Sequence, residues 1–202
     1  MSAPVLVCFA VPQEAKPFQK LVRGRDDVHV LLTGMGARSA ERSIRAALED
    51  VRPSHVFSCG FAGALDPELR IGDVITARER ALPGAKPVTF TCAERIAITV
   101  AEKSALRART SADAVEMESA VVARICRERG IECATLRAVS DTAHDDLPLD
   151  FNALMNDDEQ LSYSKLALGI LRRPNAIPGL MRLGKNSAFA ARALAAALAK
   201  LI

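Results

Sequence analysis

Short apolar runs alternate with amphipathic stretches along the chain. Residues 5–9 are continuously apolar, which is typical of a strand buried on both faces of a sheet. Residues 37–50 instead repeat apolar positions at helical spacing and stop shortly before Pro53. Further strands are predicted at 28–33 and 55–59, and a short helix at 13–21. This order of elements predicts a βαβ crossover and therefore a parallel sheet.

The second half of the chain continues this alternation with more interruptions. Strands are predicted at 73–77, 96–100, 115–117 and 133–139, and helices at 101–109 and 118–129. Gly130 is predicted to close the last of these helices as its cap. Two glycine-containing stretches, 34–36 and 60–63, are predicted to end strands as turns. No repeat and no break in composition divides the chain, so residues 1–202 are predicted to form one α/β domain.

Composition narrows the class of protein. A chain of 202 residues can bury a sufficient core without disulfides or metals, and its 50% of hydrophobic residues exclude disordered and fibrous classes. No apolar run approaches the roughly 20 residues needed to span a bilayer, and the first residues lack the basic region of a signal peptide. We therefore expect a cytoplasmic protein. Its five cysteines include no C-x-x-C pair and are interpreted as reduced thiols in the core.

Charge is unevenly distributed along the chain. The net charge of +3 implies no global attraction to nucleic acid. Residues 141–159 nevertheless contain seven acids and no Lys or Arg, whereas residues 160–202 contain seven Lys or Arg and no acid. The segment at about 160–202 is predicted to be helical and basic. It has two interpretations, a helix packed on the core with a solvated face or a helix lying on an anionic membrane.

Carboxyl groups fall at the ends of predicted strands. Glu116 and Glu118 follow one short strand, and Ser140 and Asp141 follow the next. Ligands bind at the carboxyl ends of the strands in open parallel sheets, so these side chains are expected to face one pocket. Asp141 in such a place can keep or share a proton, although a helix-capping aspartate is the alternative. Glu14 lies near the start of a helix, where an acid also interacts favourably with the helix dipole.

The glycine-containing stretches 34–36 and 60–63 are weaker indications of a ligand site than the acids. Gly36 belongs to a lone G-x-G, which a tight turn explains, although backbone N–H groups before a helix also suit an anion or a sugar hydroxyl. The stretch at 60–63 fits a turn that lets a flat ring approach the backbone. Arg38, Arg42 and Arg45 recur at helical intervals and are interpreted as a solvated face.

One long stretch carries a family resemblance. The run AVEMESAVVARICRERGIECATLRAVSDTA at 114–143 resembles the signature of the nucleoside phosphorylase and nucleosidase superfamily, which includes methylthioadenosine/adenosylhomocysteine nucleosidases and futalosine hydrolases. The stretches FAVPQEAKPF, LLTGMGARSA and HVFSCGFAGALDPELRIGDVI extend the resemblance over roughly residues 5–145. The resemblance implies a three-layer α/β/α fold with a central mixed, mostly parallel twisted sheet. It also implies cleavage of the N-glycosidic bond of a purine nucleoside.

The resemblance implies roles for particular residues. Asp141 would be the acid at N7 of the leaving purine and Ser140 would orient it, while Glu14 would orient the attacking water. Met117 would pack on the ribose, Glu118 would accept hydrogen bonds from its hydroxyls, and Glu116 would be an auxiliary polar contact. The remaining residues implied to lie beside base and sugar are Phe61, Ala62, Gly63 and Val115. An acid at the base and anions near the sugar suit a reaction that builds negative charge on the purine and positive charge on the ribose.

The chain also departs from the nucleosidases. The segment ITVAEKSALRARTSADAVEME is short and lacks the G-D-x-F loop that carries the aromatic stacking on adenine there. In this segment and in SDTAHDDLP the chain looks most like the hopanoid-associated phosphorylases, which implies a 5′-substituted adenosine with a lipid-like tail.

The type of reaction and the partners stay open at this point. Hydrolysis is favoured by Glu14, whereas Gly36 and Arg38 would supply part of a phosphate site if inorganic phosphate is the co-substrate. No metal or organic cofactor is expected, and the resemblance implies a homo-oligomer. The rival hypothesis is a non-catalytic nucleotide- or nucleic-acid-binding α/β module, which leaves the positions of Asp141 and the 116–118 acids without a purpose.

Overall fold

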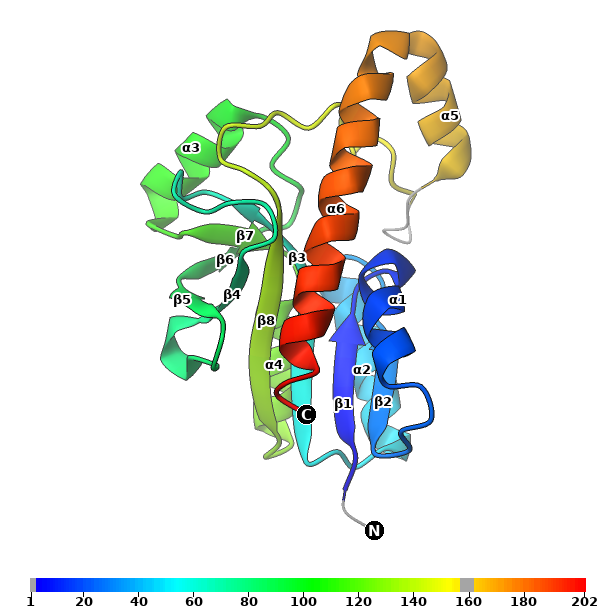
Figure 1. The fold of residues 1–202 in the computed structure, drawn as a ribbon, viewed down its shortest axis with the longest axis vertical. Coiled ribbons are helices and arrows are strands. Elements are labelled where there is room, and N and C mark those ends of the chain that lie inside the picture. The colour runs from blue at the N-terminus through cyan, green and yellow to red at the C-terminus, as the bar shows by residue number, and fades with distance from the viewer. Residues whose placement is uncertain (1–2, 157–161) are drawn as a thin grey trace.

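The apolar runs of the N-terminal half form three neighbouring parallel strands. A computed structural model, which describes residues 3–156 and 162–202, places β1 (Val5–Phe9) between β2 (Val28–Leu32) and β3 (His55–Ala64) (Figure 1). β8 (Glu132–Asp141) pairs in parallel with the other edge of β3. The helix α2 (Ala37–Asp50) connects β2 to β3 with the predicted bounds. These elements confirm the predicted crossover.

The rest of the sheet is mixed. β4 (Val74–Ala77) runs antiparallel to β8 and parallel to β5 (Lys86–Val88), which gives the order β2-β1-β3-β8-β4-β5. β7 (Ala114–Glu116) pairs antiparallel with the end of β3, and β6 (Phe90–Cys92) pairs in parallel with β7. The sheet is therefore mixed and mostly parallel, as predicted.

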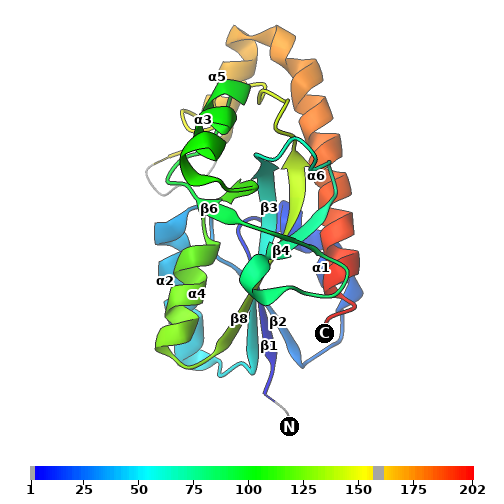
Figure 2. The ribbon, with the colours of Figure 1, turned by 90° about the vertical axis from the view of Figure 1, so that its left-hand side faces the viewer.

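Helices cover both faces of the sheet. α1 (Pro12–Leu21) and α6 (Ile177–Leu198) lie on one face, and α4 (Ser119–Glu128) joins α2 on the other (Figure 2). The remaining helices are α3 (Val100–Thr110), α5 (Tyr163–Arg172) and the short turns Arg78–Arg80 and Pro174–Ala176. The predicted three-layer α/β/α class is confirmed.

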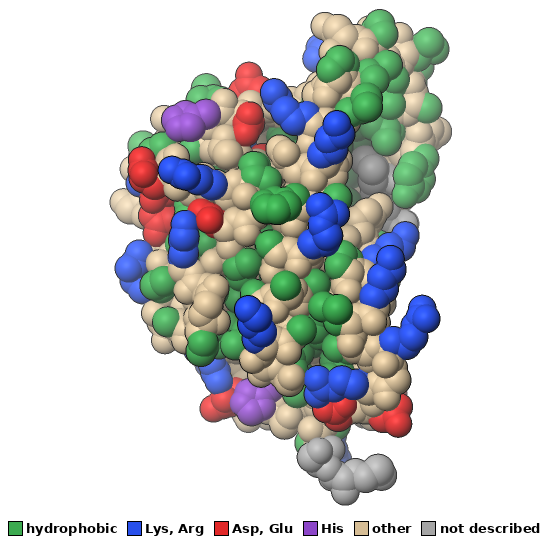
Figure 3. Space-filling model, in the orientation of Figure 1, with side chains coloured by type: hydrophobic (Ala, Val, Ile, Leu, Met, Phe, Trp, Pro, Cys, Tyr) green, Lys and Arg blue, Asp and Glu red, His purple; other side chains and the backbone are tan. Residues whose placement is uncertain are grey.

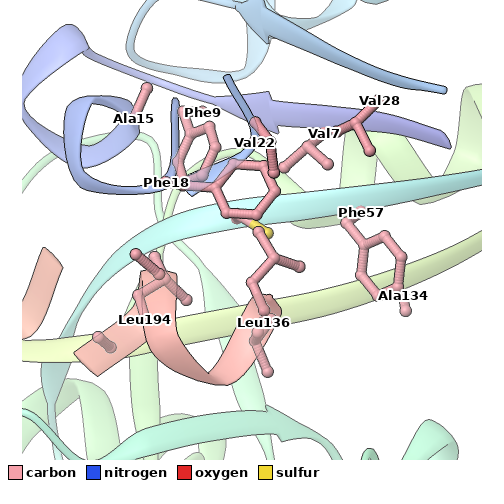
Figure 4. Close-up of a cluster of buried hydrophobic side chains, with 14 of the residues drawn as sticks. Val7, Phe9, Ala15, Phe18, Val22, Val28, Phe57, Ala134, Leu136 and Leu194 are labelled. Carbon is pink, nitrogen blue, oxygen red and sulfur yellow. The ribbon is translucent and has the colours of Figure 1, made fainter. Parts of the chain in front are cut away.

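Alternate residues of β1 belong to two separate hydrophobic cores, one on each face of the sheet. Val7 and Phe9 of β1 point to the layer of α1 and α6, where they meet Phe18 and Leu194 (Figure 4). Leu6 and Cys8 point the other way, into a cluster with the apolar faces of α2 and α4. Burial of one such side chain is worth about 1.5–3 kcal/mol, so the continuous apolar runs stabilise both layers at once.

The basic C-terminal segment forms α5 and α6, and residues 160 and 161 at its predicted start lie outside the described residues. α6 buries Ala190, Leu194 and Leu198 against the sheet and α1. Its first half projects past the sheet and pairs with α5 as a helical hairpin (Figure 1). Within the ranges that the structure describes, no helix is both long and apolar enough to cross a membrane.

The strand predicted at 96–100 is wrong. The backbone N–H and C=O of Ile96 both bond to the side-chain amide of Asn152, at 2.8 and 2.9 Å, and so cannot join a strand ladder. Thr99 then caps α3, because its hydroxyl accepts the N–H of Glu102 while the Glu102 carboxylate accepts the N–H of Thr99. This segment is a wall of the site described below.

The turn predicted at 60–63 is also wrong, because β3 continues through it to Ala64. β8 pairs with β3 along this whole stretch, with a register shift between Ala62 and Gly63, and this pairing keeps the stretch in the sheet. The glycines serve a different purpose from a turn. A Cβ at position 60 would lie 2.9 Å from the Glu14 carboxylate, and one at position 63 would lie 3.1 Å from that of Asp141. They let two carboxylates approach the backbone of β3.

Candidate active site

The site lies beside the second half of β3. One edge of this strand pairs with β1 as far as Ser58 and with β7 from Gly63, and a cavity of about 250 Å³ opens next to the stretch between them. Ten of the twelve predicted site residues line the cavity: Glu14, Phe61, Ala62, Gly63, Val115, Glu116, Met117, Glu118, Ser140 and Asp141. The expected meeting of the strand ends therefore occurs. β7 brings its acids there by running antiparallel to β3, not parallel as expected.

Glu14 is held at this edge by backbone groups. Its carboxylate accepts the N–H of Phe61 at 2.8 Å and those of Ala10 and Val11 at 3.0 and 3.2 Å. The side chain is buried, and burial raises the pKa of Glu14 above its ordinary value although the three N–H groups and Arg137 oppose the shift. A carboxyl group with a raised pKa beside a cavity is suited to accept a proton from water.

Asp141 occupies the end of β8 and is only 9% exposed. Its Oδ1 accepts the Ser140 hydroxyl at 2.7 Å, and its Oδ2 lies 2.6 Å from Nζ of Lys103. Both oxygens are thus held by donors, of which Ser140 lines the cavity and Lys103 does not. These two donors fix the orientation of the carboxyl group.

A buried ion pair supports the 116–118 acids. Nη2 of Arg137 lies 2.6 Å from Oε2 of Glu116 and also donates to the Ser58 hydroxyl at 3.1 Å. The Glu116 carboxylate further accepts the backbone N–H and the hydroxyl of Ser119 at 2.8 Å and contacts the Cys92 thiol. Burial opposes ionisation of Glu116, yet Arg137 and these donors hold its pKa below the ordinary value. Protein groups thus hold both oxygens of the Glu116 carboxylate, and its auxiliary polar contact with the substrate stays a prediction.

Glu118 has one direct backbone partner. The N–H of Gly36, a residue with φ of 80°, donates to its Oε1 at 2.8 Å, and Arg137 lies 3.9 Å from its Oε2. Burial and the nearby Glu116 raise the pKa of Glu118 to about 7, against the opposing effect of Arg137 and Gly36. This carboxyl group can therefore change its ionisation near neutral pH.

The predicted phosphate residues do not reach the cavity wall. Gly36 already donates its N–H to Glu118, and Arg38 is exposed on α2. Neither belongs to the lining of the cavity. Arg95 does line it, and its guanidinium lies 2.8 Å from Glu102.

Sequence reasoning missed several members of the site. Arg137 stands four residues before Asp141 within the recognised motif, but nothing local showed that its side chain would be the largest fully buried one among the described residues. Lys103 had a weak signal, because it shares the buried face of α3 with Leu106, where a charge is unusual. The lining residues that distant segments supply had no local signal: Met35, Ile96, Leu147, Phe151, Leu183 and Ser187.

A second, larger cavity of about 930 Å³ adjoins the first. Both are lined by Phe61, Phe151 and Leu183, and the second extends between α1, α5 and α6. Among the described residues of its lining, Lys16 is the one charged side chain. The polar site therefore opens into an apolar space.

Comparisons with known proteins agree with this fold. The family model described as the Phosphorylase superfamily matches residues 8–91 and 79–172. A 5′-methylthioadenosine/S-adenosylhomocysteine nucleosidase of Glaesserella parasuis is 26% identical over 171 residues, which cover 64% of this chain and 74% of the relative. An aminodeoxyfutalosine nucleosidase of Helicobacter pylori is 38% identical over 60 residues, or 30% of this chain and 26% of the relative.

Solved structures share the fold. The 5′-methylthioadenosine/S-adenosyl homocysteine nucleosidase of Campylobacter jejuni matches with a TM-score of 0.67 at 17% identity and covers 98% of this chain and 100% of its own. The native futalosine hydrolase of Helicobacter pylori matches with a TM-score of 0.68 at 17% identity, over 97% and 95% of the two chains.

The fold and the acid-lined cavity together define an α/β protein of the nucleoside phosphorylase type. The chain belongs to the Phosphorylase superfamily, and the family predicted from its motifs is confirmed.

Glu118 makes the stability of the protein depend on pH. Its raised pKa means that the folded state binds a proton more tightly than the unfolded state, so this contribution to stability is full below about pH 4.5 and is lost as the pH rises through about 7. Glu118→Gln, which stays neutral, should therefore become more stable relative to wild type by several degrees between pH 5 and 8. Thermal unfolding of both proteins over this range measures the difference. Melting temperatures that keep a constant offset would show that Glu118 does not titrate there.

Proposed function

We propose that the chain hydrolyses the N-glycosidic bond of a 5′-substituted adenosine and releases adenine. The observation that carries the proposal is the convergence of Asp141, Glu14 and Glu118 on one cavity at the edge of β3. Membership of the Phosphorylase superfamily and the relatives named as nucleosidases support the reaction class. A module that only binds nucleotides would have no need of this set of carboxyl groups.

The acid end of the site acts on the base. Breaking the bond leaves negative charge on the purine, and a proton or hydrogen bond at N7 stabilises it. Asp141 supplies this group, and the 2.7 Å hydrogen bond from Ser140 supports an orienting role for the serine. The neighbouring residues Phe61, Ala62, Gly63 and Val115 form the wall against which base and sugar lie.

The other carboxyl groups act on the sugar and the nucleophile. Glu118 accepts hydrogen bonds from the ribose hydroxyls, and Met117 packs on the ribose. Glu14 orients the attacking water and takes its proton, a role that its burial and raised pKa support. Glu116 acts indirectly, because its ion pair with Arg137 holds the segment that carries Met117 and Glu118.

Hydrolysis is favoured over phosphorolysis. Of the two residues expected to bind phosphate, Gly36 already donates its N–H to Glu118, and Arg38 is exposed on α2. Glu14, by contrast, lines the cavity. The reaction proposed here uses water and needs no metal or organic cofactor, with inorganic phosphate as the co-substrate only under the alternative.

The larger cavity supports a bulky apolar 5′ substituent. It adjoins the catalytic cavity and carries a single charge among its described lining residues. A space of about 930 Å³ is far larger than a methylthio group requires. This agrees with the resemblance to the hopanoid-associated phosphorylases, whose expected substrate carries a lipid-like tail.

Release of free base is the test of the reaction. Methylthioadenosine, adenosylhomocysteine, adenosine, inosine and a 5′-alkylthioadenosine with a long alkyl chain are incubated with the protein, each with and without millimolar phosphate, and separated by chromatography. We expect adenine without phosphate and the highest kcat/KM for the long alkyl chain. Release only with phosphate would establish phosphorolysis, and binding without release would favour the non-catalytic module.

Asp141→Asn should lower kcat by about 10²–10⁴-fold, because the amide cannot give a proton to N7. The amide keeps the size of the side chain but leaves the buried Lys103 ammonium without its anionic partner, so thermal unfolding must establish that the variant is folded. The matched control is Asp146→Asn, an exposed acid near the same segment, which should leave turnover unchanged. Full activity of Asp141→Asn would contradict the acid role.

We also propose that the helical hairpin contacts an anionic membrane. The hairpin consists of α5 and the start of α6 (residues 163–185), and Figure 3 shows hydrophobic side chains gathered over α5 with Lys and Arg over α6. Its exposed hydrophobic residues are Tyr163, Leu168, Leu171, Ile177 and Met181. The hairpin also carries five Lys or Arg and no acid. This combination suits the headgroup region of an anionic bilayer.

Co-sedimentation with vesicles tests this contact. Binding to phosphatidylserine vesicles should exceed binding to phosphatidylcholine vesicles and should fall about thirtyfold in Arg172→Gln/Arg173→Gln, since each of the two cations near the surface is worth about 1 kcal/mol. Lys20→Gln/Arg23→Gln removes the same charge from another surface and is the control. Equal losses in the two variants would indicate unspecific attraction.

A homo-oligomer in the cytoplasm completes the proposal. Family membership supports assembly, and the five free thiols support a reducing compartment. Sedimentation equilibrium should return a multiple of 21.6 kDa, and a monomer mass at all concentrations would exclude assembly.

A further inference from the structure

Lys103 is a buried cation that forms an ion pair with the proposed acid. It lies on α3, and its side chain is 1% exposed. Its Nζ donates to the backbone carbonyls of Thr142 and Asp145, each at 2.8 Å, and lies 2.6 Å from Oδ2 of Asp141. An ammonium group has three N–H donors, and these three oxygens use all of them.

The hydrogen bonds around Asp141 raise a difficulty for its role. Oδ1 accepts the Ser140 hydroxyl and Oδ2 faces the Lys103 ammonium, which is the pattern of a carboxylate. A carboxylate has no proton to give to N7. The one cationic donor that an ion pair joins to Asp141 among the described residues is Nζ of Lys103, and Lys103 is absent from the lining of both large cavities, so it acts on the substrate only through Asp141.

From this geometry we propose that Lys103 is the proton source for the leaving base and acts through Asp141. The proposal rests on the proposed function and adds a positioning residue to it. As the C1′–N9 bond breaks, its electron pair goes to the purine. A proton moves from Nζ of Lys103 to Oδ2 of Asp141, and a proton of the Asp141 carboxyl group moves to N7.

The reaction then balances without any further reactant. Water gives its hydroxyl to C1′ and its proton to Glu14. The step leaves neutral adenine, a neutral Lys103 amine and the Asp141 carboxylate. After the products leave, Glu14 returns its proton to solvent and Lys103 regains one through Asp141, which borders the cavity.

The alternative is a purely structural Lys103 that ties α3 to the segment 141–145. Two substitutions separate the alternatives. Lys103→Arg keeps a positive charge and several donors, but a guanidinium does not release a proton in a protein. Lys103→Gln keeps two donors for the carbonyl oxygens and loses both the charge and the transferable proton.

The first readout is turnover of the adenosine substrate found by base release. Lys103→Gln and Lys103→Arg should each lower kcat by about 10²–10⁴-fold and leave KM within about threefold, since Lys103 does not touch the substrate. Thermal unfolding establishes that each variant is folded. Wild-type turnover in Lys103→Arg would overturn proton delivery, and a rise in KM with unchanged kcat would assign Lys103 a structural role.

The second readout removes the need for an acid. The leaving group of 4-nitrophenyl β-D-ribofuranoside departs as a stable phenolate without a proton. On this substrate both variants, and Asp141→Asn, should retain turnover within about threefold of wild type. A loss equal to that on the nucleoside would overturn the proposal.

Arg107→Gln is the matched control on α3. Arg107 lies one turn beyond Lys103 and pairs with Asp66 at 3.0 Å, and neither residue lines the cavity. Its turnover should equal that of wild type on both substrates. A different result would overturn the proposed function itself, namely that the wild-type protein releases no base at all.

Discussion

The ion pair between Arg137 and Glu116 is the interaction on which the site depends. Both side chains are 1% exposed, and the pair joins β8 to the last residue of β7. Removing two charges from water is costly, and breaking such a pair leaves an uncompensated charge at a cost of about 3–5 kcal/mol. Arg137 recovers part of this cost by serving several groups at once. It holds Glu116 ionised, reaches Glu118 and donates to Ser58 of β3.

The same guanidinium sets the electrostatics of the neighbouring acids. Burial raises the pKa of Glu14 and Glu118, and the positive charge of Arg137 opposes both shifts. Without that cation, three carboxyl groups in one low-dielectric cavity wall would repel one another when ionised. Lys103 has the corresponding place beside Asp141. Two buried cations thus allow four acids to line a small cavity, and the sheet holds one of them directly, since Arg137 belongs to β8.

Local patterns predicted most of the elements for a clear reason. A continuous apolar run identified β1, because this strand is buried on both faces by two helical layers. Helical spacing identified α2 to the residue. The strand expected at 96–100 failed because Asn152, distant in the chain, takes the hydrogen bonds of Ile96. The turn expected at 60–63 failed because pairing with β8 outweighs the flexibility of two glycines.

The sequence by itself determined the layers, the family and the acids of the site, because hydrophobic periodicity and a contiguous motif involve only residues that are close to one another in the chain. Only the tertiary structure decided how those acids are compensated. Lys103 meets Asp141 across 38 positions, and Arg137 meets Glu116 across 21. Packing also decided three further features: β7 runs antiparallel to β3, Glu14 lies at the edge of β3, and an apolar cavity adjoins α6. A pattern of single residues cannot specify which distant partner removes the cost of a buried charge, because that cost is set by the surroundings that folding creates.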